Sequence, residues 1–160
     1  MKSNEYQFST DWRVEASREL IYDIIAAGEE YPRWWPDVYL SVESEGSTVG
    51  GQPGSRLRLH TKGWLPYTLE WTAETVRAER PSGFEIRATG DFDGRGIWTF
   101  TQEGPITHAH FDWRLRADKP LLRTLSFALK PLFKWNHRWA MERGRERLVK
   151  EVARRLERGG

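Results

Sequence analysis

The sequence predicts an α+β fold, in which a curved antiparallel sheet of about seven strands is covered by a long C-terminal helix. Apolar and polar residues alternate over residues 6–15 and again from residue 37 to about 117, as they do in strands with one buried face. After Asp118, apolar residues recur at the spacing of an amphipathic helix. A one-sided sheet needs a cover, and this helix is the only long amphipathic element that can provide it.

The length and composition of the chain indicate a single domain and exclude several kinds of site. A chain of 160 residues predicts a single domain, 1–160. The 25 Lys and Arg residues nearly balance the 23 Asp and Glu residues, which does not indicate nucleic acid as a partner. The absence of cysteine excludes disulfides, iron–sulfur clusters and thiolate metal sites. No apolar run is long enough for a signal peptide or for stable membrane insertion, so we expect a cytoplasmic protein.

The N-terminal third contains a strand, a helix and a short aromatic segment. Tyr6 to Glu15 alternates with a period of two. Ser17 is a plausible N-cap for a helix that ends near Gly28. The segment Tyr31–Pro36 follows, and its prolines restrict it to a turn or a brief helix.

The pattern in the middle of the chain predicts strands separated by turns. Val38, Leu40 and Val42 alternate in the first of these strands. A Gly- and Pro-rich loop follows at residues 46–54, and Gly90–Gly94 resembles a hairpin connection. The last strand lies at residues 107–116.

The C-terminal region predicts two helical stretches. Leu121–Phe133 carries an apolar stripe that can be a ligand portal, a dimer contact or core, and we expect Pro131 to kink or interrupt the helix. A second stretch, from about Lys134 to Leu156, places four apolar residues on one face: Met141, Leu148, Val152 and Leu156. This stretch is rich in Lys and Arg, which we interpret as a solvated helix face because glutamates are interspersed.

Nine tryptophans in a chain of this size indicate either an aromatic core or a cavity lined with rings. Strand alternation points the following residues to the inner face of the sheet: Phe8, Trp12, Leu57, Leu59, Tyr67, Leu69, Trp71, Phe84, Ile86, Phe111 and Trp113. A curved sheet around a single helix tends to leave a hollow, because one helix does not fill a wide concave surface.

The chain resembles the START/SRPBCC superfamily, in its polyketide cyclase/dehydrase-like branch. The order of elements carries the resemblance, together with Tyr31–Pro36, Gly90–Phe100 and Trp135–Met141. It covers nearly the whole chain and implies a helix-grip fold. Members of the superfamily typically hold a hydrophobic small molecule between sheet and helix; some are aromatase/cyclases, and others carry lipids, sterols or quinones. No residue here matches a characterised cyclase site, so the resemblance assigns no catalytic role.

His137 and Tyr67 are the candidates for acid–base chemistry. His137 lies one turn before Met141, on the buried side of the last helix, where it serves either as a polar contact in the cavity or as a core histidine. We expect Asn136 to point away from it and to cap the helix. Arg145 is expected to extend to water, to pair with a carboxylate, or to meet an acidic ligand. The predicted ligand-binding residues are Tyr67, Leu69, Trp71, Trp98, Phe111, Trp113, His137, Met141 and Arg145.

Neither a cofactor nor a metal is predicted. His108, His110 and Asp112 lie on one strand face, but this face is opposite Phe111 and Trp113 and should be in water. We therefore expect a protein that binds or carries a hydrophobic molecule, lipid-like or aromatic. The alternative is a cyclase or dehydratase that uses His137 or Tyr67 to transfer protons. A third interpretation is a structural or regulatory protein whose interior is filled by its own rings.

Overall fold

The computed structural model describes residues 5–46, 48–64, 67–117 and 120–159, with side chains described except at 117, 120–130 and 159. Its elements are β1 (Glu5–Glu15), α1 (Arg18–Ala26), the short 3-10 helix η1 (Gly28–Glu30), α2 (Tyr31–Trp34), β2 (Tyr39–Ser44), β3 (Arg56–Lys62), β4 (Thr68–Glu79), β5 (Gly83–Gly90), β6 (Phe92–Glu103), β7 (Ile106–Ala117) and α3 (Pro120–Gly159). The apolar stripe predicted for Leu121–Leu129 lies outside the described side chains.

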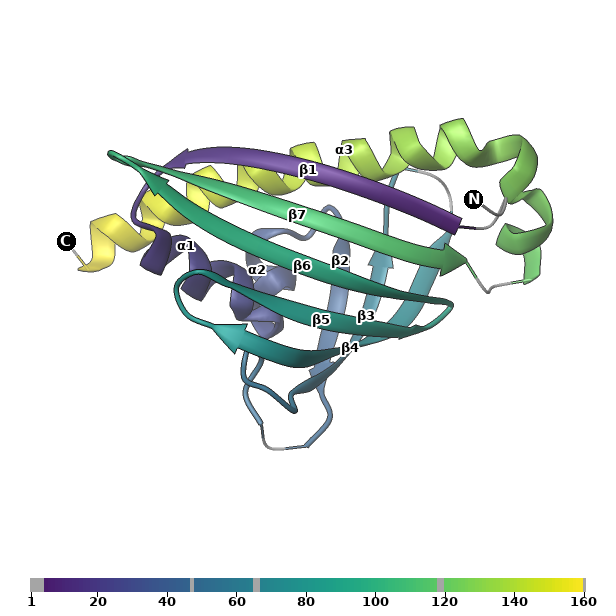
Figure 1. Cartoon of the computed structure of the whole chain (residues 1–160), viewed down its shortest axis with the longest axis horizontal. Coiled ribbons are helices and arrows are strands. Elements are labelled where there is room, and N and C mark those ends of the chain that lie inside the picture. Colours follow the sequence, from purple (N-terminus) through teal and green to yellow (C-terminus); the bar gives the residue numbers. More distant parts are fainter. Residues whose placement is uncertain (1–4, 47, 65–66, 118–119, 160) are drawn as a thin grey trace.

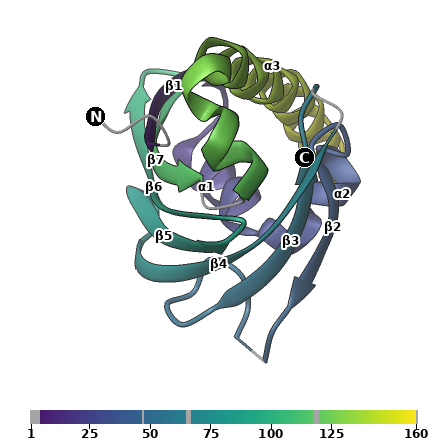
Figure 2. The ribbon, with the colours of Figure 1, turned by 90° about the vertical axis from the view of Figure 1, so that its right-hand side faces the viewer.

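The strands form one antiparallel sheet of seven, in the order β1-β7-β6-β5-β4-β3-β2. The sheet curves, and α3 runs along its concave side, with α1 and α2 below one end of the helix (Figures 1 and 2). The predicted α+β helix-grip architecture is confirmed. No helix among the described residues is both long and apolar enough to cross a membrane.

The start of α1 follows the predicted cap. The Ser17 hydroxyl accepts a hydrogen bond from the Leu20 N–H, and Glu19 lies in the first turn. Its buried residues, Ile21, Ile24 and Ile25 among them, face the sheet. The aromatic segment that follows forms α2, a helix of four residues, in agreement with the expected brief helix.

The sequence interpretation misplaces three apolar residues. Leu40 does not alternate inward, because a bulge between Tyr39 and Ser41 turns it outward, where it is 40% exposed. Phe92 is not part of a hairpin loop; it begins β6 and is buried. Leu156 does not share the buried face of Met141, Leu148 and Val152, since it is 55% exposed.

Pro131 does not interrupt the C-terminal helix. It lies inside α3, which continues without a break from Pro120 to Gly159. The ribbon bends in its first turns (Figure 1), which fits the loss of one backbone hydrogen bond at an internal proline. The two predicted helical stretches are therefore one helix.

Gly144 allows α3 to approach α2 closely. A Cβ at this position would lie 2.3 Å from the ring of Trp35, which is itself buried. Only a residue without a side chain permits this distance between helix and ring. The approach fixes the C-terminal half of α3 over the core and leaves its earlier turns to cover the remaining concave surface.

Candidate functional site

The concave side of the sheet encloses a cavity of about 220 Å³ beneath α3. A dry engineered cavity of about 150 Å³ is known to hold benzene, so this hollow has room for a larger apolar molecule. Its walls come from β1 to β7 and from α1, α2 and α3, and they are mostly apolar side chains. The interior is therefore not filled by its own rings, as the third interpretation of the sequence assumed.

A continuous series of aromatic rings forms the sheet side of the cavity. Trp98 stacks on Phe111 with centroids 4.5 Å apart, and Phe111 stacks on Trp113 at 5.4 Å. Trp113 in turn meets Trp71 at 5.7 Å. Gly96 makes the series possible, because a Cβ there would lie 2.9 Å from the rings of both Phe111 and Trp113. The rings lie against the backbone of β6 and leave the space in front of them open.

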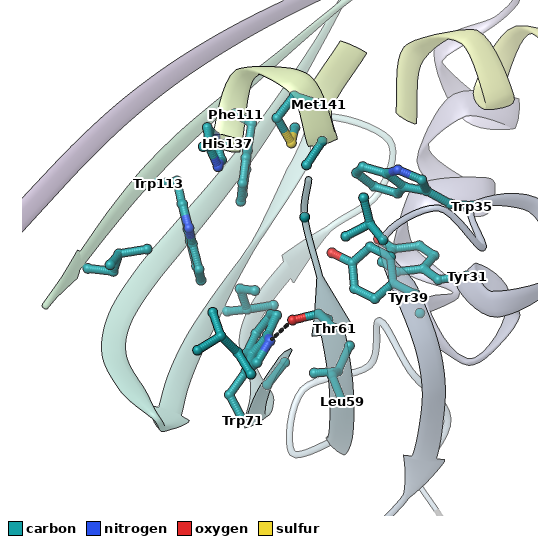
Figure 3. A pocket seen from close by; sticks show the side chains of 18 of the residues that line it. Tyr31, Trp35, Tyr39, Leu59, Thr61, Trp71, Phe111, Trp113, His137 and Met141 are labelled. Atoms are coloured by element: carbon teal, nitrogen blue, oxygen red, sulfur yellow. Dashed lines mark hydrogen bonds between the residues drawn. The ribbon is translucent and has the colours of Figure 1, made fainter. Parts of the chain in front are cut away.

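A second aromatic group closes the opposite wall. Tyr31, Trp35 and Tyr39 are in mutual contact, with centroids 4.7 to 5.8 Å apart. The hydroxyl of Tyr31 donates a hydrogen bond to the Ile25 carbonyl. The Tyr39 hydroxyl has no hydrogen-bond partner among the described residues and points into the cavity (Figure 3).

His137 enters the cavity from α3. Its ring stacks on Phe8 at 4.0 Å, and its Nε2 is buried with no hydrogen-bond partner among the described residues. In Figure 3 the ring lies beside Phe111 and Trp113. Burial lowers the pKa of His137 to about 4, so the imidazole is neutral at physiological pH. A neutral, unpartnered imidazole can donate or accept one hydrogen bond from a bound molecule.

The remaining polar groups of the cavity are few. The Trp71 indole N–H donates to the Thr61 hydroxyl at 3.1 Å, within the buried wall (Figure 3). Burial, with a smaller contribution from Tyr6, raises the pKa of Tyr67 to about 12, so its phenol is also neutral. Lys62 is the only charged side chain among the described lining residues, and none of these is a carboxylate.

Eight of the nine predicted ligand-binding residues line this one cavity: Tyr67, Leu69, Trp71, Trp98, Phe111, Trp113, His137 and Met141. Arg145 does not; it is exposed on the outer side of α3 and extends to water, one of the three outcomes expected for it. Asn136 does not cap a helix, because α3 begins sixteen residues earlier, and it lines the cavity next to Gly63. Whether the eight residues bind a ligand stays a prediction.

Sequence reasoning missed the wall made by Tyr31, Trp35 and Tyr39. The bulge at Leu40 shifts the alternation of β2 by one residue, so Tyr39 faces inward. The sequence shows only that aromatic residues gather between Tyr31 and Tyr39, because Tyr39 lies in β2 and no helical period spans the three residues.

The histidine pair lies on the outer face of the sheet, as expected. The partner of His108 and His110 is Asp11 of β1, whose Oδ1 lies 2.8 Å from each ring, and not Asp112. The hydrogen bond from His110 lowers the pKa of the Asp11 carboxyl. Among the described residues no group of three or more acidic, histidine or cysteine side chains is arranged to hold a metal ion.

Comparison with known proteins supports a single family. Residues 6–158 match the family model described as polyketide cyclase/dehydrase and lipid transport. A START superfamily protein from Mycobacterium smegmatis is 20% identical, with a TM-score of 0.71 and coverage of 92% of this chain and 97% of that one. The Zhui aromatase/cyclase from Streptomyces sp. R1128 is 14% identical, with a TM-score of 0.70 and coverage of 95% and 96%.

A more distant structure has the same fold. The ginseng major latex-like protein 151 from Panax ginseng is 9% identical, with a TM-score of 0.60 and coverage of 77% of this chain and 92% of that one. At these identities the likeness to solved structures concerns the fold alone. No curated protein matches the chain.

Proposed function

Because the chain belongs to the polyketide cyclase/dehydrase and lipid transport family, we propose that it binds and carries one hydrophobic small molecule, lipid-like or aromatic, in the cavity under α3. Membership of this family implies hydrophobic ligand binding or polyketide cyclase activity. The observation that carries the proposal is the hollow of about 220 Å³ behind the stacked rings of Trp98, Phe111 and Trp113. Cavities of this kind bury apolar ligands and orient them with a few polar groups.

The polar groups of the cavity favour an uncharged ligand. His137 and Tyr67 are both neutral, and no carboxylate among the described lining residues is available to pair with a cation. Lys62, the one charged side chain among them, is exposed to water and not buried in the interior. A charged group buried here without a partner would be strongly disfavoured. The unpartnered Nε2 of His137 and the hydroxyl of Tyr39 instead suit a molecule with one or two hydroxyl or carbonyl groups.

A cyclase or dehydratase is the second candidate, since His137 and Tyr67 reach the same cavity. However, no carboxylate among the described lining residues orients His137 or raises its basicity, in contrast to an acid–base pair. A pKa of about 4 makes the imidazole a weak base near neutral pH. Carriage is therefore the better supported of the two functions.

The test is binding of 2-naphthol, a neutral bicyclic phenol, followed by quenching of tryptophan fluorescence. Ala140 lines the cavity from α3, whereas Ala153 is exposed on the same helix. Ala140→Phe should fill the hollow and weaken binding at least tenfold, and the matched Ala153→Phe should bind as the wild type does. Equal binding by both variants, or no binding of any neutral aromatic or lipid by the wild type, would contradict the proposal.

His137→Phe separates the two functions. The variant keeps the stacked ring on Phe8 and removes the polar nitrogen. Carriage predicts weaker binding of 2-naphthol with binding of naphthalene unchanged. If the protein instead converts a polyketide-like substrate, turnover should fall by orders of magnitude while substrate binding is retained.

A further inference from the structure

Two tryptophans are exposed at the edge of the cavity. Of the nine in the chain, Trp64 and Trp135 are 57% and 43% exposed, and their rings meet edge to face at 4.8 Å. Leu132, one turn earlier on α3, is 40% exposed. We call Trp64, Leu132 and Trp135 the tryptophan patch. Large apolar side chains gathered in water usually mark a surface that contacts something else.

The patch lies beside the cavity. Gly63 and Asn136, the sequence neighbours of the two tryptophans, both line the hollow. They also touch each other across the gap between the β3–β4 connection and α3, since a Cβ on Gly63 would lie 2.4 Å from the Asn136 amide. The tryptophan patch therefore covers the outside of the place where these two segments meet.

The surroundings of the patch are basic. Lys62, Lys134 and Arg138 are exposed beside it, and none of them forms an ion pair with another described residue. Residues 46–69 contain no Asp or Glu, and residues 119–141 contain five Lys or Arg and no Asp or Glu. Several surface arginines elsewhere are paired, as Arg13 is with Glu103 and Arg80 with Asp23, although Arg58, Arg87 and Arg145 are exposed without an ion pair to a described residue. Cations without partners next to exposed indoles complement a negatively charged surface.

We propose that the tryptophan patch docks on an anionic lipid bilayer and places the adjacent end of the cavity against it. Indole rings favour the boundary between water and hydrocarbon, and Lys and Arg side chains are attracted to anionic headgroups. Helices with basic residues next to tryptophan and leucine are typical of peripheral attachment, without insertion across the membrane. Exchange of a lipid-like ligand at the docked surface rests on the proposed function, whereas docking itself does not.

Docking is tested by co-sedimentation with vesicles of phosphatidylcholine containing 30% phosphatidylglycerol, compared with phosphatidylcholine alone. The wild type should bind the anionic vesicles at least tenfold more tightly, with weaker binding at high salt. Trp64→Ala combined with Trp135→Ala, and separately Lys134→Glu combined with Arg138→Glu, should each reduce binding about tenfold. The control combines Val149→Ala with Leu156→Ala, exposed apolar residues farther along α3, and should bind as the wild type does.

These assays distinguish a failure of ligand binding in the cavity from a failure of membrane docking. Without vesicles, the tryptophan double variant should still bind 2-naphthol, while Ala140→Phe should lose 2-naphthol and keep vesicle binding. If the wild type does not bind anionic vesicles, as expected for a patch that meets an acidic protein instead, docking is overturned whatever the result with 2-naphthol. Equal vesicle binding by the tryptophan variant and the control would also overturn it.

Discussion

The two ends of the concave face use aromatic residues in different ways. At the end near α1 and α2, Trp12 and Trp34 do not line the cavity and pack with fully buried residues such as Ile24 and Leu148. At the other end, Tyr6 is the only buried member of its cluster among the described residues, and its neighbours Phe8, Tyr67, Leu69 and Phe133 are partly buried and line the cavity. Rings that fill space stabilise the fold, whereas rings that border a hollow are available for a ligand. Substitutions at the two ends should therefore affect different quantities.

The largest expected effect is at the packed end. Leu148 is fully buried and does not line the cavity, so Leu148→Ala should lower the free energy of unfolding by about 3 kcal/mol, through lost burial and a new void. Leu69→Ala makes the same chemical change beside the existing hollow and should cost about 1 kcal/mol. Urea denaturation measures both. Equal losses would show that the two ends are packed alike.

The next largest change in the free energy of unfolding is expected for a substitution of Glu151. Its carboxylate is 2% exposed and accepts hydrogen bonds from Arg33 of α2 and from Arg154 and Arg155 of α3, at distances down to 2.7 Å. Burial alone would raise the pKa of Glu151, but the three guanidinium groups outweigh it and hold the pKa well below its usual value of 4.5. Glu151→Gln should cost about 2 kcal/mol at pH 7, because hydrogen bonds between charged groups are lost.

The stabilisation by the Glu151 carboxylate should decrease at acidic pH. Since the pKa of Glu151 is depressed in the folded state, the stabilisation is complete above pH 4.5 and is lost as the pH falls below that value. Glu151→Gln should therefore flatten the decline of stability below pH 4.5. If Glu151→Gln loses stability between pH 5 and pH 3 as steeply as the wild type does in urea titrations, this carboxylate does not have the proposed role.

His137 should act in a different pH window at the hollow end. The folded state keeps the ring neutral down to a pKa of about 4, whereas the unfolded chain protonates it near 6.5. Stability is therefore unaffected above pH 6.5 and falls as the pH drops from 6.5 towards 4, by about 1.4 kcal/mol at pH 5.5. His137→Phe should remove this decline, while the loss of stability below pH 4.5 that is due to Glu151 should remain. Unfolding curves at pH 5.5 and 7.5 provide the measurement.

The smallest effect is expected for Tyr67→Phe. The hydroxyl accepts or donates no hydrogen bond to a described residue, so its loss should change the free energy of unfolding by less than about 0.5 kcal/mol. If the protein is a carrier, binding of naphthalene should also be unchanged. A large loss of turnover on a polyketide-like substrate, with stability retained, would favour the enzyme instead.

The sequence predicted the sheet and the inner face well, because strand alternation is a local signal. Phe111 and Trp113 of β7 and Tyr67, Leu69 and Trp71 around β4 were placed inside from period alone, and all five line the cavity. The Ser17 cap was also local and is confirmed. By contrast, the bulge that turns Tyr39 inward depends on the pairing of β2 with β3, and periodicity within β2 does not contain it.

By itself, the sequence determined which side chains face inward and that a long helix had to cover them. Only the tertiary structure decided that the rings leave a hollow and where it lies. The approach of Gly144 to Trp35 sets where α3 crosses the sheet, and the missing side chain at Gly96 lets the rings of Phe111 and Trp113 approach β6 closely. Both are contacts between distant parts of the chain. Because the volume of a cavity is what remains after all such contacts are made, no single segment of sequence carries it.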